Sequence, residues 1–286
     1  MANAKAKPEI DTYTAVRGVH LAAPTQSAES AYKIEVRFLA GLTETQKNAF
    51  KKAADRWSEV IVGDVPSVLV GGEVIDDLVI EAQGTDIDGP GGILGQAGPT
   101  NLRPASAGAS AFLPAKGIMS FDTADLAQME ADGTLVDVIT HEMGHVIGIG
   151  TVWEQKGLLT GKGTNNPRFT GATAKKAFGE LKGQGPTAVP VENTGGAGTR
   201  DSHWRETVFK NELMSGFIAA PNNPISMLTV AQLGDLGYVV DMDAAEPYKL
   251  PNLADLAERG LMIAAPLHVH ALPILAPKVL PDGSLV

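Results

Sequence analysis

The stretch His141-Glu142-Met143-Gly144-His145 (HEMGH) carries the H-E-x-x-H pattern of a zinc hydrolase. Residues four apart on a helix share a face, so His141 and His145 can point both imidazoles at one metal ion. Glu142 stands beside them, where its carboxylate can take the proton of a zinc-activated water. The five residues therefore predict two metal ligands and a general base on one helix.

The sequence around this motif predicts the helix that the motif needs. The helix is expected to begin near Thr134, and Gly148 and Gly150 are residues at which it can end. One face of it is apolar and is expected to be buried, and this face is formed by Leu135, Val138, Ile139, Val146 and Ile147.

The segments that precede the motif predict α+β order. A strand is expected at 32–38, where apolar and polar residues alternate. A helix is expected at 44–62, behind a capping box formed by Thr43 and Gln46. Further short strands, separated by Gly and Pro, are expected at 66–70, 77–82, 92–97 and 117–121.

Composition along the chain suggests four parts. Residues 1–30 are expected to form an irregular N-terminal arm, and 31–150 an N-terminal catalytic lobe that contains the motif helix. Residues 151–245 begin with a loop-rich segment of Gly, Thr, Asn and Lys and would form a C-terminal lobe. Residues 246–286 are expected to form an extended, Pro-rich tail, packed on the body or on a partner. Short helices are predicted at 172–181 and 228–236.

Composition excludes several classes of protein. The 286 residues are 44% hydrophobic and 20% charged, which is typical of a globular protein, and the formal net charge is −10. Without a basic run, this acidity argues against a nucleic-acid partner. The chain has no cysteine, so it can hold neither disulfides nor a Cys-ligated metal. No segment approaches the ~20 apolar residues that a membrane span needs.

One metal ligand is missing from the motif, because catalytic zinc usually takes three protein ligands and keeps a fourth position for water. The remaining histidines are His20, His203, His268 and His270, and a Glu on a following helix is an alternative. The surroundings of His203, Ser-His-Trp followed by Asn-Glu-Leu-Met-Ser-Gly, favour it. His268 and His270 could hold a separate ion, but such a pair in a tail is more often solvated or packed.

The extended motif resembles the leishmanolysin-like (peptidase M8) metzincin zinc metalloproteases. Gly148 follows His145 by three residues, as in metzincins, but Thr151 occupies the position where the short form of their motif has its third His. Leishmanolysin-like members carry an insertion there and have their third His in a Ser-His-Trp-like context, followed by Glu-Leu-Met. SHW at 202–204 and ELMSG at 212–216 match both features.

This resemblance covers roughly residues 33–243 and includes RWSEVIVGDVP at 56–66 and ISMLTVAQLGDLGY at 225–238. It is closest to bacterial members, because the cysteines of the eukaryotic enzymes, and with them a cysteine switch, are absent. It implies a secreted or extracellular protein. The first 18 residues nevertheless contain no apolar core of a signal peptide, so the chain is either not exported by that route or has lost its signal.

The resemblance also implies a two-lobed zincin, with a twisted mixed sheet and the motif helix in the upper lobe and a loop-rich lower lobe. Its zinc ligands would be His141, His145 and His203, with Glu142 as general base. The resemblance makes Met214 the methionine turn, an apolar floor beneath the metal, and makes Gly148 the turn between lobes. Gly216 stands where some metzincins have a Tyr ligand, so no such ligand is expected. An edge strand containing Ile93, Leu94, Gly95 and Gln96 would pair with substrate.

Together these features predict a zinc metalloendopeptidase that acts on protein or peptide substrates. The alternative is a zinc-stabilised binding or self-processing protein with little general proteolytic activity. Calcium is a second candidate cofactor, but the acidic residues nearest to a suitable grouping fit no EF-hand loop and are more typical of solvated turns. These residues are Asp86, Asp88, Asp122 and Asp125. The sequence does not set the oligomeric state.

Overall fold

The computed structural model describes residues 10–17, 31–89, 95–196, 198–218, 220–252 and 276–286. Within these residues the fold is α+β and is built on a six-stranded mixed sheet of order β1-β2-β5-β7-β6-β11. β2, β5 and β7 are parallel to one another, β1 is antiparallel to β2, β6 is antiparallel to β7, and β11 is parallel to β6. The bounds of these strands are Asp11–Val16 (β1), Lys33–Phe38 (β2), Leu78–Thr85 (β5), Pro114–Asp122 (β7), Gly95–Leu102 (β6) and Lys278–Val279 (β11).

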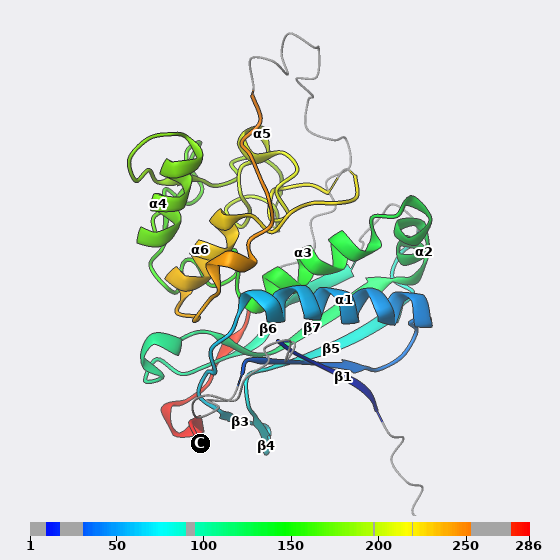
Figure 1. Cartoon of the computed structure of the whole chain (residues 1–286). Helices are drawn as coiled ribbons and strands as arrows, with labels where there is room; N and C mark the ends of the chain where they lie inside the picture. The colour runs from blue at the N-terminus through cyan, green and yellow to red at the C-terminus, as the bar shows by residue number, and fades with distance from the viewer. Residues whose placement is uncertain (1–9, 18–30, 90–94, 197, 219, 253–275) are drawn as a thin grey trace, which may run out of the picture.

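Two long helices lie side by side on one face of this sheet (Figure 1). The first, α1 (Glu44–Val60), begins at the predicted capping box, since Thr43 Oγ1 accepts from the Gln46 N–H and Gln46 Oε1 accepts from the Thr43 N–H. The second, α3 (Leu135–Ile147), carries the HEMGH motif. The indole of Trp57 joins the two helices by donating to the Thr140 carbonyl at 2.9 Å.

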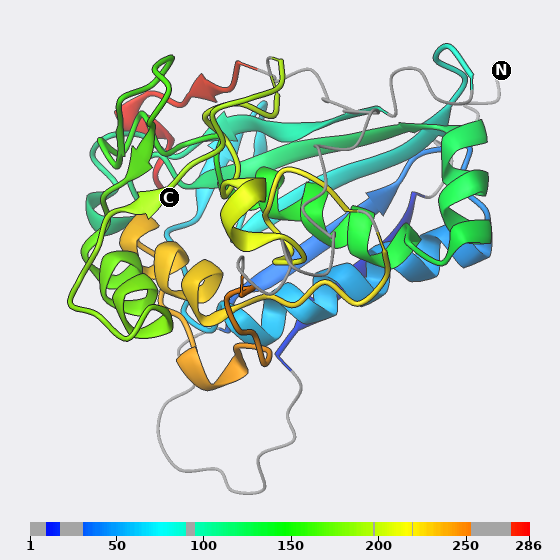
Figure 2. The ribbon, with the colours of Figure 1, turned by 90° about the horizontal axis from the view of Figure 1, so that it is seen from above.

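The rest of the described chain is short helices, short strands and loops. After α3, the described residues from 151 to 252 lie largely on the side of α1 and α3 that faces away from the sheet, and part of them extends past one end of the sheet (Figure 1 and Figure 2). The remaining helices are α2 (Thr123–Asp132), α4 (Ala172–Leu181), α5 (Glu206–Phe209) and α6 (Met227–Leu236), with one-turn 3-10 helices at Gly108–Ser110, Met242–Ala244 and Asp282–Ser284. The remaining strands are β3 (Val68–Val70), β4 (Glu73–Ile75), β8 (Leu159–Thr160), β9 (Arg168–Phe169) and β10 (Val189–Pro190).

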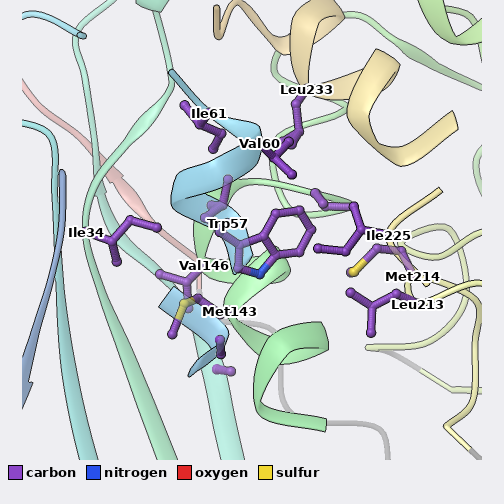
Figure 3. Packing of buried hydrophobic residues seen from close by; sticks show 14 of the residues in the cluster. Ile34, Trp57, Val60, Ile61, Met143, Val146, Leu213, Met214, Ile225 and Leu233 are labelled. Carbon is purple, nitrogen blue, oxygen red and sulfur yellow. The ribbon is translucent and has the colours of Figure 1, made fainter. Parts of the chain in front are cut away.

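A continuous buried core connects the helices to the segment after α3. Figure 3 shows Trp57 of α1 between Met143 and Val146 of α3 on one side and Leu213, Met214 and Ile225 on the other. All of these side chains are at most 1% exposed. Residues brought together from three distant parts of the sequence therefore fix the position of the motif helix.

Several sequence expectations need correction. The arm at 1–30 is not irregular throughout, because Asp11–Val16 forms β1 and pairs antiparallel with β2. The described end of the tail, 276–286, packs on the body, which was one of the two expectations, and there it adds a strand to the main sheet, β11, that was not expected. The elements β4 and α2 were not expected, and neither were the short β8, β9, β10 and α5. Helix α2 is capped at its start by Asp122, whose side chain accepts from the Ala124 N–H, and it ends at Gly133 in the left-handed conformation. No helix among the described residues is long and apolar enough to span a membrane.

Candidate metal centre

The motif helix α3 carries the three side chains of HEMGH that were predicted to act at the metal, and all three are buried. His141, Glu142 and His145 are each at most 8% exposed. The helix approaches the sheet closely because Gly117 of β7 has no side chain, and a Cβ there would lie 2.3 Å from Val146 Cγ1. At its end, Gly148 adopts a φ of 120° and its N–H donates to the Gly144 and His145 carbonyls. Glycine at position 148 thus permits the turn that was expected there.

The third histidine reaches the same point from a loop. His203 lies in an extended segment between β10 and α5, where the Glu192 N–H donates to its carbonyl at 2.9 Å and the Trp204 N–H donates to the Met214 carbonyl at 2.9 Å. The imidazole of His203 meets those of His141 and His145, although 58 residues separate it from His145. The structure therefore brings together all three residues that were predicted to bind zinc.

The three Nε2 atoms form a nearly equilateral triangle. The Nε2 separations are 3.0 Å between His141 and His203, 3.1 Å between His141 and His145, and 2.9 Å between His145 and His203. A zinc–nitrogen bond is about 2.0–2.1 Å long, so the three atoms are close enough together to hold one zinc ion between them. The donor set, three neutral imidazoles, is one that zinc favours.

Hydrogen bonds on the far side of each ring fix its tautomer. The Nδ1 atoms lie 2.6 Å from the Leu213 carbonyl (His141), 2.9 Å from the Ile149 carbonyl (His145) and 2.9 Å from the Thr199 carbonyl (His203). A carbonyl only accepts, so each Nδ1 carries the proton and each Nε2 presents a lone pair. Three lone pairs about 3 Å apart repel one another unless a cation lies among them, which is why this arrangement fits a metal.

Burial keeps these rings neutral. Desolvation, followed by the charge of His145, lowers the pKa of His141 to about 3. Desolvation lowers the pKa of His145 to about 4 and that of His203 well below its ordinary value. A proton therefore does not bridge the nitrogens near neutral pH. Burial alone raises the pKa of Glu142 to about 8, as expected for a carboxylate in an apolar site before a cation is bound.

Met214 lies against the motif helix at the one position where the helix has no side chain. A Cβ at Gly144 would lie 2.8 Å from Met214 Sδ and 3.1 Å from the Trp57 ring. Gly144 directly precedes His145, so the methionine packs against the motif helix next to a predicted ligand. The residue before it, Leu213, accepts the hydrogen bond from His141. Sequence reasoning singled out Met214 but not this role of Gly144.

Glu212 is the main residue of this region that sequence reasoning missed. Its carboxylate is 0% exposed, accepts from the Met214 N–H at 2.6 Å, and accepts from the hydroxyls of Ser226 and Thr229 at 2.7 and 2.5 Å. It therefore holds the Met214 turn to the start of α6. Desolvation raises its pKa, and these hydrogen bonds oppose the rise. The sequence contains no signal for this role beyond the presence of Glu in the Glu-Leu-Met segment.

The other predicted residues fall into three groups. Thr151, which replaces the expected histidine of the short motif, donates its hydroxyl to the His145 carbonyl at 2.8 Å and so closes the end of α3. Gly95 and Gln96 begin β6, next to β7. The predictions for Ile93, Leu94, His20, His268 and His270 lie outside the described residues.

The calcium hypothesis finds no support in the described part of the chain. Asp122 Oδ2 accepts from the N–H groups of Ile87, Asp88 and Gly89, and Oδ1 caps α2. These backbone bonds lower the pKa of Asp122 to about 2 and occupy its oxygens. Among the described residues, three other carboxylates lie close enough together to reach one ion, and none of them was predicted to bind calcium. They are Asp64, Asp76 and Asp77. Asp122 is therefore a structural cap.

Comparison with known proteins agrees with this geometry. The family model for leishmanolysin (peptidase M8) matches residues 109–256, just over half of the chain. Leishmanolysin of Leishmania donovani is 31% identical over 142 residues, which are 46% of this chain and 24% of the relative. The Leishmania major protein is 32% identical over 142 residues (46% and 23%), and a leishmanolysin homolog of Crithidia fasciculata is 29% identical over 136 residues (44% and 20%). The chain spans about a quarter of the length of these relatives. It belongs to the leishmanolysin family of metallopeptidases.

Proposed function

We propose that this protein is a zinc-dependent metalloendopeptidase that hydrolyses peptide bonds in protein or peptide substrates. The observation that carries the proposal is the triangle of lone-pair nitrogens of His141, His145 and His203 beside the Glu142 carboxylate. Membership of a metallopeptidase family supports the same reaction class. In this proposal the three histidines are the zinc ligands and Glu142 is the general base.

The ligand count favours catalysis over a structural role for the metal. Structural zinc sites have four protein ligands, whereas catalytic sites have three and leave one position open. Among the described residues, no fourth His, Asp or Glu atom joins the three histidines within ligand distance. The arrangement thus supports an open position for water and substrate. It gives no support to the alternative of a binding protein that keeps zinc only as a staple.

A bound zinc ion would polarise the scissile carbonyl and lower the pKa of a water molecule to about 7. The chain's own residues supply the remaining parts. Glu142, adjacent to the first ligand, accepts the proton of the attacking water and delivers it to the leaving amine. Burial raises the pKa of Glu142 in the metal-free site, and the charge of a bound zinc ion would oppose that rise, so that the carboxylate can accept a proton.

The surrounding structure would keep the ligands in register. In the proposal Met214 is the methionine turn that forms an apolar floor, and Gly148 is the turn that leads from an upper lobe, 31–150, into a lower lobe, 151–245. The carbonyls that accept from the three Nδ1 atoms prevent ring rotation, which reduces the cost of ordering the site when metal binds. Substrate would pair with the exposed edge of β6, beginning at Gly95 and Gln96.

The test separates the base from the ligands. Glu142→Gln should retain zinc but lose casein cleavage by at least about a hundredfold, because general base catalysis contributes 10²–10⁴-fold. The matched control is Glu130→Gln on the exposed face of α2, which should cleave like the wild type. Casein cleavage by Glu142→Gln at the wild-type rate would contradict the proposed mechanism.

A further inference from the structure

The edge of β6 that faces away from β7 is free over only part of its length. In the parallel pairing of β11 with β6, Lys278 lies opposite Asn101 and Val279 lies opposite Leu102. The Leu280 N–H also donates to the Leu102 carbonyl at 2.9 Å. In the described part of the chain, no strand pairs with this edge of β6 between Gly95 and Thr100. A peptide that adds to this edge therefore meets β11 at Asn101.

This boundary lies close to the end of the motif helix. Gly117 pairs with Pro99, and a Cβ on Gly117 would meet both the Gly98 carbonyl, at 2.9 Å, and Val146 Cγ1, at 2.3 Å. Val146 directly follows the ligand His145, so Gly98 and Pro99 pass over the end of the motif helix. From Gly98 to Asn101 is three residues, or about 10 Å at ~3.3 Å per residue.

Two further features of β6 coincide with the boundary. Pro99 has no N–H to offer a pairing peptide, and proline in a sheet is typical of edge positions. The register against β7 shifts between Pro99 and Asn101, which marks a bulge at Thr100. The part of the edge that can pair regularly with a peptide thus ends between Gly98 and Asn101.

A hollow of about 470 Å³ lies on the same side of the site. Its walls include Gly150, Thr151 and Ser202, each next to the end of the motif helix or to His203, and Ala276 and Pro277, which lead into β11. Figure 2 shows the red segment that contains β11 beside the loops that follow α3. The segment that leads into β11 therefore also forms part of the wall of this hollow.

Buried contacts hold β11 in place. Leu280 is 8% exposed and packs with Val68 and Ala115, among others, in a second buried cluster. The Val286 N–H donates to the Ser67 carbonyl at 3.0 Å, and Leu285 bridges Val68. The side chains of Lys278 and Val279, by contrast, are exposed. The strand is thus anchored through Leu280 and its neighbours, and its pairing with β6 can be altered without changing the core.

We propose that residues 276–280 cap the substrate-pairing edge of β6 and limit the substrate to about three paired residues on one side of the scissile bond. This inference rests on the proposed peptidase function. Antiparallel pairing is the more stable arrangement per residue, so a bound peptide runs from Asn101 toward Gly95. The restricted side is then the one N-terminal to the scissile bond, and the protein acts as a peptidase with few subsites on that side.

A ladder of peptides tests the limit in the wild-type protein. Peptides share one cleavage site and one C-terminal half, and carry two, three, four or six residues before the scissile bond. The expected kcat/KM rises up to about three residues and then stays level or falls, because later residues find no strand edge. A kcat/KM that rises steadily up to six residues would overturn the proposal.

A variant tests the cause of the limit. Replacing both Lys278 and Val279 by proline removes their N–H donors and prevents regular pairing, whereas Leu280 remains as the anchor. The expected result is a gain of about tenfold in kcat/KM for the six-residue peptide and no change for the two-residue peptide, since one or two added hydrogen bonds have that effect. The matched control has alanine at both positions and keeps the backbone N–H donors. It is expected to show the same dependence of kcat/KM on peptide length as the wild type.

The outcomes separate this inference from the function on which it depends. If neither the wild type nor any variant cleaves any peptide, the peptidase function fails. If all of them cleave with the same length profile and the proline variant melts like the wild type, the cap fails. If the proline variant unfolds, the length dependence of kcat/KM in the wild-type protein still tests whether the cap limits the substrate.

Discussion

The two halves of the metal centre are held in different ways. His141, Glu142 and His145 lie on one regular helix, where backbone geometry sets their spacing. His203 lies in a loop whose position depends on hydrogen bonds between distant segments. Its Nδ1 donates to the Thr199 carbonyl, and the N–H of the next residue, Trp204, donates to the Met214 carbonyl. The Met214 N–H in turn donates to the Glu212 carboxylate. The helical half therefore needs only local structure, whereas the loop half depends on buried polar groups. Substitutions can test this difference.

The largest effect is expected from Glu212→Ala. It would leave the Met214 N–H and the hydroxyls of Ser226 and Thr229 without their acceptor in a fully buried site. The expected loss is on the order of 3 kcal/mol or more in the free energy of unfolding, measured by urea denaturation. Glu180→Ala, at an exposed site on α4, is the control and should change it by less than about 0.5 kcal/mol. Equal effects would show that Glu212 does not hold the loop half together.

Gly144→Ala is expected to disturb the contact between the two halves. The added Cβ would lie 2.8 Å from Met214 Sδ, so the methionine must move. Overpacking of this kind costs about 1–3 kcal/mol, read as a lower Tm. Gly234→Ala in α6 is the matched control, because its nearest neighbour is Val240 Cγ2 at 3.7 Å. That control should gain up to about 1 kcal/mol from helix propensity. A stabilised Gly144→Ala would mean that Met214 does not rest on the helix.

Acid should destabilise the metal-free protein through the histidines. Their pKa values are lowered in the folded state, so below about pH 6.5 the unfolded chain binds protons that the folded protein does not. Stability therefore falls as pH is lowered from 7 to 5. The raised pKa of Glu142 acts in the opposite direction, so the melting series is run in Glu142→Gln after chelation. Adding His203→Ala to this variant should make its Tm depend less steeply on pH. An unchanged dependence of Tm on pH would count against a buried, neutral His203.

The smallest effect is expected from Thr151→Val, which removes the hydroxyl that donates to the His145 carbonyl but keeps the shape of the side chain. The expected loss is about 1 kcal/mol in the free energy of unfolding, with zinc binding intact. If zinc were lost instead, the end of the motif helix would depend on this loop contact more than its regular geometry suggests.

The same division explains what could be predicted from the sequence. The helical spacing of HEMGH was sufficient for His141 and His145, and the capping box at Thr43 and Gln46 located the start of α1. His203 came from family resemblance, because no local pattern links a loop histidine to a helix far away. Glu212 and Gly144 could not be recognised, since a buried carboxylate and a glycine that admits a methionine acquire their roles only in the folded protein. β11 was missed because two residues are too few for a strand signal.

The most direct test of the account is the zinc content of His203→Ala, measured by elemental analysis after dialysis against a trace of zinc. Lys176→Ala, at an exposed site on α4, is the control, since its side chain has no contact with the three histidines. We expect about one zinc per chain in the wild type and in Lys176→Ala, and a large loss in His203→Ala, because two histidines alone do not complete a catalytic site. Unchanged zinc in a folded His203→Ala protein would contradict the three-histidine centre.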